Sequence, residues 1–413
     1  MDGGAFPKVL QAMLSPVFEQ LSLPQRKHLR WFLFGILMTV RSTTLLHVAR
    51  VAPRGGHRTS CGSFLRSDWD SVSLMQARAI ETLRWMKPGK REAFYLIIDD
   101  TKIEKRGRKM DAVSKIYDHK SRRFIRGHIV VTAAIMFRGV VLPWKFDLWI
   151  PKDQAGDSYR KLTQIAAQMI NELELPFADL KVRVLFDAFF LAPCVVKSCE
   201  SRGFTWLSVA SKNRNLKRKY CQKRSIKQFA AGVLRHNSKR VRLRRARFWR
   251  WMRIAAVDGE LGRLGQVRMV LSKRPGDPWK KTLAVVTNET KLAAREIMTI
   301  YEKRWNIEVL FKELRSSLGL CDYQVLSRHA IERHLHLCGM AHQLLTHHSL
   351  TAQGAKAKVQ SEEVSLPPLR ERLDQLQCKI RTQQAKVMLA GIKNKNARTN
   401  IRAFLKNELQ IAA

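Results

Sequence analysis

The hydrophobic period of the chain changes at Ala93, and this change constrains the fold more than any other feature of the sequence. In residues 1–90 apolar side chains recur at helical spacing, whereas Phe94–Ile98 is a short continuous apolar run. A run of this kind is typical of a buried strand. Further strand-like stretches lie at 127–137, 140–150, 182–186 and 204–209, and helical periodicity lies at 157–175, 292–318 and 331–347. The sequence therefore predicts an α/β core flanked by helices.

The charge of the chain indicates its partner. Its 413 residues include 76 Lys and Arg but only 34 Asp and Glu, so the formal net charge is +42. A compact protein with this charge repels itself unless it meets a polyanion, and nucleic acid is the usual one. The most apolar stretch, Trp31–Val40, is too short to span a bilayer. Seven cysteines without a CxxC pair favour a reducing compartment. We therefore expect a cytoplasmic, nucleoid-associated protein with no membrane partner.

One segment concentrates the basic residues. Ser201–Val257 contains no Asp or Glu, and this absence predicts a surface that faces an anion rather than an ordinary solvated face. Its candidate DNA contacts are Arg247, Trp249 and Trp251. The tryptophans would stack on an unpaired base, and packing within the segment is the alternative. Lys102, outside this segment, is a candidate for a contact with the DNA backbone, or else a solvent-facing lysine.

Four carboxylates stand out from their basic surroundings. Asp99 and Asp100 end the first strand, Asp187 ends the strand at 182–186, and Glu308 lies in the helix at 292–318. Carboxylates from neighbouring strand ends can converge on divalent cations, which prefer oxygen ligands, and two such ions can drive phosphodiester hydrolysis. A carboxylate from a helix packed on the sheet would complete the site. Taken singly, each strand-end aspartate is more readily explained as a turn former.

The helix around Glu308 favours the metal site. Tyr301, Arg304, Glu308 and Arg315 lie within a narrow stripe at about 100° per residue. One face therefore presents a carboxylate beside a phenol and two guanidiniums, an arrangement suited to a metal-bound phosphate. An Arg304–Glu308 ion pair on a surface helix is the competing explanation, but it leaves Tyr301 and Arg315 unexplained.

Three blocks in this order resemble the DDE transposases of bacterial insertion sequences, whose catalytic core is RNase H-like. The first is the apolar strand that ends in Asp99-Asp100-Thr101, and the second is Val184–Phe190 around Asp187. The third is similar to the Tyr-x2-Arg-x3-Glu-x6-Lys signature of one subgroup of this family. Tyr301, Arg304 and Glu308 match that signature, and Arg315 replaces its Lys.

The resemblance implies both chemistry and roles. Asp100, Asp187 and Glu308 would hold two Mg2+ ions, with Mn2+ as a substitute. Asp100 is preferred to Asp99 because it directly precedes Thr101. Tyr301, Arg304 and Arg315 would position phosphates, so these three and the candidates Lys102, Arg247, Trp249 and Trp251 form the expected DNA-binding set. One strand at a transposon end would be hydrolysed, and its 3′-hydroxyl would then attack a phosphate of target DNA or of the opposite strand.

Partners and rival functions follow from the same resemblance. The partners would be double-stranded DNA, as terminal inverted repeats and as target, and a second subunit in a synaptic homodimer. One rival is an RNase H-fold endonuclease that does not join DNA. Another is a domesticated, non-catalytic DNA-binding protein.

The expected organisation has five parts. A helical DNA-binding region at 1–90, or a helical cap on the core, precedes the first part of the RNase H-like core at 91–211. A basic, partly β insertion at 212–290 is followed by closing helices with the catalytic Glu at 291–350. A basic helical region fills 351–413.

Overall fold

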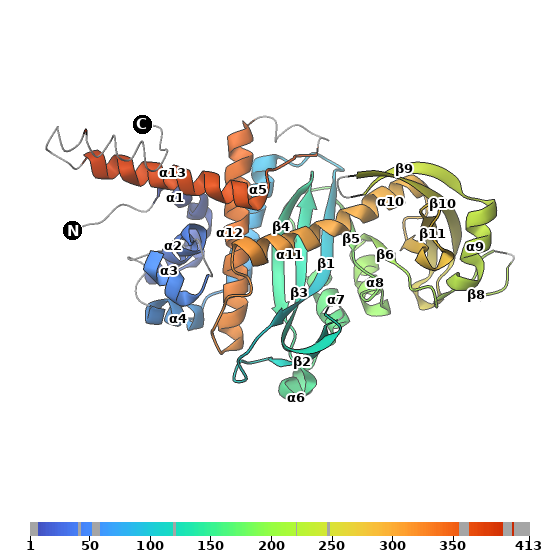
Figure 1. Ribbon diagram of the computed structural model, residues 1–413, viewed down its shortest axis with the longest axis horizontal. Helices are drawn as coiled ribbons and strands as arrows, with labels where there is room; N and C mark the ends of the chain where they lie inside the picture. The colour runs from blue at the N-terminus through green and yellow to red at the C-terminus, as the bar shows by residue number, and fades with distance from the viewer. Residues whose placement is uncertain are drawn as a thin grey trace.

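A ten-stranded sheet forms the centre of the protein in the computed structural model (Figure 1). The structure describes residues 7–39, 43–51, 58–118, 121–219, 221–245, 248–354, 363–390 and 399. The strands follow one another across the sheet in the order β2-β3-β1-β5-β6-β12-β11-β10-β9, and β4 also pairs with β3. The predicted α/β architecture is confirmed.

Five strands make the part of the sheet on which the candidate site is built. They are β1 (Ala93–Glu104), β3 (Arg123–Phe137), β4 (Val140–Leu148), β5 (Lys181–Leu185) and β6 (Thr205–Val209). β1, β3 and β4 are antiparallel neighbours, whereas β5 and β6 run parallel to β1. The β3–β4 turn has positive φ at Arg138 and Gly139, as a tight two-residue hairpin requires.

β1 is buried on both faces, which explains its continuous apolar sequence. Phe94, Leu96 and Ile98 pack in one hydrophobic cluster, and Ile97 and Ile103 pack in the other. The strand does not end at Asp100, because its pairing with β3 continues as far as Glu104 opposite Gly127. The prediction that the two aspartates lie at the end of the strand is therefore wrong. They lie within it.

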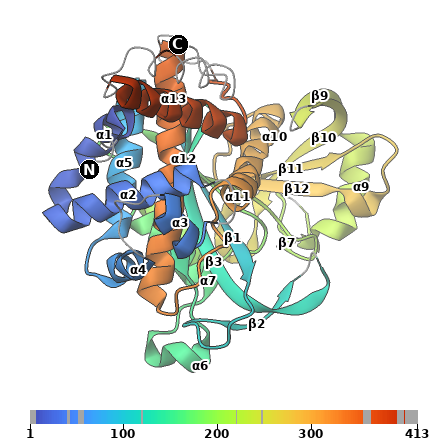
Figure 2. The same ribbon diagram turned by 60° about the vertical axis from the view of Figure 1, so that its left-hand side comes forward.

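Helices cover both faces of the sheet (Figures 1 and 2). α7 (Leu162–Asn171) and α8 (Pro193–Ser201) contribute to one hydrophobic cluster, whereas α10 (Ala294–Glu302), α11 (Asn306–Ser317) and α12 (Arg328–Gln353) contribute to the other. The helix predicted at 292–318 is in fact two helices, because a 3-10 turn at Lys303–Trp305 separates α10 from α11.

The N-terminal helices lie around α12, on the far side of the molecule from β9 and β10 (Figure 1). They are α1 (Lys8–Leu14), α2 (Leu23–Met38), α3 (Leu45–Val51), α4 (Arg58–Arg66) and α5 (Ser71–Met86). α13 (Leu369–Ala390) packs on α11 and α12. Most of the predicted helical region after Ala390 falls outside the described residues. No helix within the described ranges has both the length and the apolar character needed to cross a membrane.

The basic segment between β6 and α10 extends the same sheet. Its elements are β7 (Asn215–Leu216), β8 (Arg224–Ser225), α9 (Ile226–His236), β9 (Lys239–Arg245), β10 (Phe248–Glu260), β11 (Gln266–Lys273) and β12 (Leu283–Thr287). β12 pairs with β6, so strands of the segment continue the core sheet. The sequence did not indicate this continuity, because the pairing joins residues far apart in the chain.

The structure makes a stability prediction at Gly127 of β3, which pairs with Glu104 at the end of β1. A Cβ at this position would lie 2.9 Å from the carbonyl carbon of Ile103, which is backbone and cannot swing aside. We expect Gly127→Ala to lower the free energy of unfolding by about 1–3 kcal/mol, the usual cost of overpacking. Gly232→Ala is the matched control, because this α9 glycine has open space around it. The control should gain about 0.5–1 kcal/mol in denaturant titrations, and equal midpoints for the two variants would contradict the prediction.

Candidate active site

The alternation of β1 places Asp99 and Asp100 on opposite faces of the sheet. Asp99 shares its face with Ile97 and Ile103, which pack in the same hydrophobic cluster as α11. Asp100 shares its face with Ile98 and lies opposite Val131. These two apolar residues pack in the hydrophobic cluster to which α7 and α8 contribute. Only Asp99 therefore points towards the helix that carries Glu308. The preference for Asp100, which rested on its place before Thr101, disagrees with this geometry.

Asp187 follows β5 on the same face as Asp99. Its carboxylate accepts hydrogen bonds from the backbone N–H groups of Phe189 (2.9 Å) and Phe190 (3.2 Å), which hold the turn after the strand. The turn-forming role considered for this residue is therefore real. Asp187 also lies close enough to Asp99 for its charge to add to the rise that burial causes in the pKa of the Asp99 carboxyl group.

Arg304 connects the strand to the helix. Its Nη1 donates to Asp99 Oδ2 at 2.9 Å, and its Nη2 donates to Glu308 Oε1 at 2.6 Å. The Arg304–Glu308 ion pair considered as the competing explanation exists, but it faces the sheet, and Arg304 also bonds to a second carboxylate. Tyr301, at the end of α10, is buried next to this group. The structure thus brings Asp99, Asp187, Tyr301, Arg304 and Glu308 together.

The titration of the cluster reflects burial and charge. Burial raises the pKa of Asp99 to about 7; Arg304 opposes this rise, and Asp187 adds to it. Burial also raises the pKa of the Tyr301 hydroxyl, against the influence of Arg304. Burial lowers the pKa of Arg304, but Tyr301 and the carboxylates outweigh it, so the net shift is upward. The Arg304 guanidinium therefore stays charged, and it partly offsets the effect of burial on the Asp99 carboxyl group.

Arg315 and Lys102 form hydrogen bonds that hold neighbouring elements of the fold together, and they do not lie among the carboxylates. Arg315 donates to Thr101 Oγ1 and, at 3.0 Å, to the carbonyl of Lys102, so it ties the end of α11 to β1. The ammonium of Lys102 donates to the carbonyl of Tyr117 at 2.7 Å. By alternation Lys102 lies on the same face as Asp100. The structure therefore does not bring Lys102 to the carboxylates.

The two predicted tryptophans also lie away from the site. A cavity of about 490 Å³ is lined by Asp187, Tyr301, Arg304, Trp305 and, from β10, Arg250. Trp249 and Trp251, next to Arg250 in an unbroken strand, project from the opposite face of β10. They are 54% and 50% exposed, and they lie beneath the guanidiniums of Arg242 and Arg240 respectively. Arg247 lies outside the described residues.

Arg250 and Trp305 are site residues that the sequence reasoning missed. Trp305 directly follows Arg304 in the signature helix and is 50% exposed, so its position was a usable signal. For Arg250 the usable signal was strand alternation, because in a strand its side chain must point away from those of Trp249 and Trp251.

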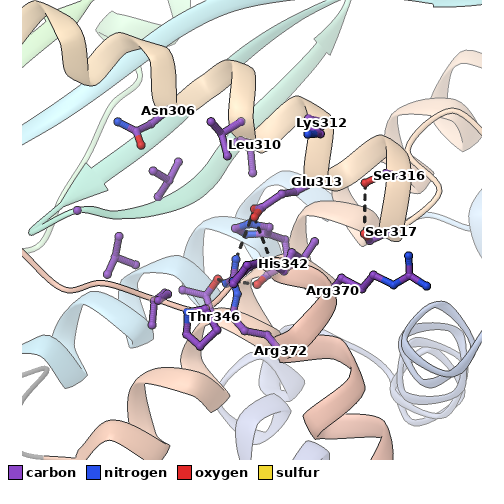
Figure 3. A pocket seen from close by; sticks show the side chains of 18 residues that line it. Asn306, Leu310, Lys312, Glu313, Ser316, Ser317, His342, Thr346, Arg370 and Arg372 are labelled. Atoms are coloured by element: carbon purple, nitrogen blue, oxygen red, sulfur yellow. Dashed lines mark hydrogen bonds and ion pairs between the residues drawn. The ribbon is translucent and has the colours of Figure 1, made fainter. Parts of the chain in front are cut away.

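Residues of α11, α12 and α13 line a second cavity, and the Glu313 carboxylate in it forms bonds that hold the fold together (Figure 3). Glu313 accepts hydrogen bonds from His342 Nε2 (3.3 Å), Arg372 Nη2 (3.4 Å) and the backbone N–H of Leu369 (3.3 Å). These bonds fasten α11 to α12 and α13. Glu313 therefore holds in place the helix on which Glu308 lies, and it is not a further member of the site.

The residues fit a divalent cation by their chemistry. Asp99, Asp187 and Glu308 supply only oxygen donors, which Mg2+ and Mn2+ prefer. As the side chains lie, no three potential ligands in the described part of the chain are close enough to hold one ion. The reason at this site is that the Arg304 guanidinium lies between Asp99 and Glu308. A cationic group thus already occupies the space between two of these three carboxylates.

Comparison with known proteins identifies the family of the chain. Residues 16–258 match the family model "DDE superfamily endonuclease", and residues 275–353 match "Archaeal putative transposase ISC1217". A relative from Microchaete diplosiphon, the "Probable transposase for insertion sequence element IS701", is 22% identical over 307 residues. The match covers 70% of this chain and 74% of the relative. The prediction of a DDE transposase is confirmed. The first of these matches spans more than half of the chain, which therefore belongs to the DDE superfamily of endonucleases.

Proposed function

We propose that the protein cuts DNA at the ends of an insertion sequence and joins the freed 3′-hydroxyl to target DNA, with Asp99, Asp187 and Glu308 as metal ligands. The observation that carries this proposal is the Arg304 fork, which links Asp99 of β1 to Glu308 of α11 while Asp187 lies on the same face. Two of the three carboxylates thus bond to the Arg304 guanidinium, and the third lines the same cavity as Arg304. Asp99 replaces Asp100 in this assignment because Asp100 faces α7 and α8.

Two divalent cations bound by these carboxylates would polarise the scissile phosphate and stabilise the attacking and leaving oxygens. The remaining groups act on DNA directly. Arg304 and Arg250 line the cavity beside Asp187, where guanidinium forks can bind phosphate oxygens. Tyr301, with its pKa raised by burial, remains a hydrogen-bond donor to the same phosphates. Arg315 holds β1 and α11 at the spacing that the carboxylates require.

The wider proposal concerns partners and parts. Terminal inverted repeats and target DNA are the duplexes that a net charge of +42 suits. Residues 1–90 would bind the transposon end, and residues 91–211 and 291–350 would form the core around the basic insertion at 212–290, with a basic helical region at 351–413. Two subunits would hold the two ends together in a homodimer. The protein would act on DNA in the cytoplasm.

A joining assay tests this function. The substrate is the DNA that flanks the reading frame in its host, with a supercoiled plasmid as target and Mg2+ in the buffer. We expect strand cuts at the element ends and covalent end–plasmid products. Cuts without joined products would instead assign a simple endonuclease, and binding without cuts would assign a non-catalytic protein. Heat-denatured enzyme and EDTA are the controls.

A further inference from the structure

The hairpin of β2 (Ser114–Asp118) and β3 carries an exposed aromatic pair. Tyr117 and Phe124 lie directly opposite each other, with ring centroids 5.2 Å apart in an edge-on arrangement. Phe124 is 61% exposed and Tyr117 is 39% exposed. The Lys115 ammonium lies 4.7 Å from the centre of the Phe124 ring. An exposed aromatic pair under a cation is a surface suited to a ligand.

The aromatic pair lies on the same face of the sheet as the candidate active site. Ile116 and Ile125 face the other way, into a small buried cluster. Phe124 and Arg126 therefore share the face of Thr132, because they are separated from it by even numbers of residues. Thr132 lies opposite Asp99 in the β1–β3 register. A duplex in contact with Asp99 can thus continue along this face towards the hairpin.

The spacing suits duplex DNA. Eight residues of β3 separate Thr132 from Phe124, which is about 26 Å of strand. At about 3.4 Å per base pair, this length corresponds to roughly seven or eight base pairs. The hairpin would therefore meet the duplex within one helical turn of the cut.

The charge around the hairpin favours a polyanion. Exposed basic side chains surround it, and they are Arg106, Arg108, Lys109, Lys115, Arg122 and Arg126. The nearby acidic groups have local partners: Glu104 pairs with Arg123, Asp111 accepts the backbone N–H of Arg328, and Asp118 accepts that of Ser121. The positive charge thus exceeds the acidic charge, as a phosphate-binding surface requires.

Hydrogen bonds connect the hairpin to α11, the helix that carries Glu308. Arg315 of α11 donates to the carbonyl of Lys102, and the Lys102 ammonium donates to the carbonyl of Tyr117. The surface is thereby fastened to the same helix as Glu308. A DNA contact at the hairpin would help to hold the scissile phosphate in register with the carboxylates.

We propose that the β2–β3 hairpin binds double-stranded DNA about seven or eight base pairs from the scissile phosphate. Lys115 and Arg126 contact backbone phosphates, and Phe124 packs with Tyr117 against the sugar edge of a groove. This inference rests on the proposed function, because the cut defines the distance. The duplex is either the transposon end or the DNA that flanks it.

A truncation experiment tests the proposal. Duplexes carry 12 base pairs on one side of the cut position and either 12 or 4 on the other, and both sides are trimmed in turn. The wild-type protein should lose about tenfold in affinity when the side under the hairpin is trimmed, and the trimmed side identifies the duplex. The variant Phe124→Ser/Arg126→Gln should lose much less affinity on trimming than the wild type does, because only Lys115 and Tyr117 remain of the proposed contacts. Fluorescence anisotropy gives each Kd.

The control is Arg123→Gln, because Arg123 belongs to the same hairpin but faces away and pairs with Glu104. It should keep the wild-type response to trimming. If the double variant loses as much on trimming as the wild type does, the hairpin does not bind DNA. If the variant changes only self-association in sedimentation, the surface contacts a second copy instead, and the proposal is overturned. Failure of the proposed function is distinct, because the wild-type protein would then not cut the long duplex.

Discussion

Asp99→Asn is expected to abolish strand cleavage, whereas Asp100→Asn should keep most of the wild-type rate. The two residues are adjacent, but only Asp99 faces Arg304 and α11. A lost carboxylate ligand removes several kcal/mol of transition-state stabilisation, which corresponds to about 10³-fold or more in rate. Asn keeps the size of Asp, so packing should be preserved at both positions.

Single-turnover cleavage of an end-labelled duplex in Mg2+ measures this difference. The cleavage rates of Asp187→Asn and Glu308→Gln should fall as the rate of Asp99→Asn does. All three variants should still bind the duplex in a gel-shift assay. Asp100→Asn is the matched control for substitution in β1. A 10³-fold loss in Asp100→Asn together with an active Asp99→Asn would reverse the assignment of the first ligand. Cleavage by Asp187→Asn or Glu308→Gln at the wild-type rate would remove that residue from the site.

Several core strands could be predicted from the sequence because each is a compact apolar run. The bounds of β4, β5 and β6 lie within one or two residues of the predicted ones. The end of β1 was missed because it depends on pairing with β3, which is not visible in the local pattern. The break between α10 and α11 was missed for a related reason, since the periodicity continues through Lys303–Trp305.

The membership of the site was harder to predict than its position. Because β1 is apolar on both faces, its sequence does not reveal which aspartate faces α11, and the structure decides this through the cluster that contains Ile97. Trp249 and Trp251 were selected by residue type, but strand alternation turns them away from the cavity and places Arg250 there. The basic character of Ser201–Val257 predicts that this segment binds DNA, whereas the geometry of each contact depends on pairing between strands that are far apart in the sequence.

Arg304→Gln should separate metal binding from cleavage. In the structure the guanidinium bonds to Asp99 and Glu308, so it competes with a cation for the same oxygens. Charge-assisted hydrogen bonds contribute about 1.5–3 kcal/mol, and their removal should therefore raise the affinity for Mn2+ about tenfold or more. Cleavage should nevertheless fall about 10²-fold, because a positioned donor to the phosphate is lost. The two quantities are expected to move in opposite directions.

Electron paramagnetic resonance of free Mn2+ measures the affinity, and single-turnover cleavage measures the rate. Arg295→Gln is the control, because Arg295 lies on α10 but is exposed, and it should change neither quantity. A purely structural role for Arg304 would weaken metal binding and cleavage together, along with the thermal midpoint. That result would contradict the competition between the guanidinium and the metal. Tighter Mn2+ binding with slower cleavage would instead mean that Arg304 stabilises the carboxylates in the absence of metal and binds the DNA phosphate once the metal is bound.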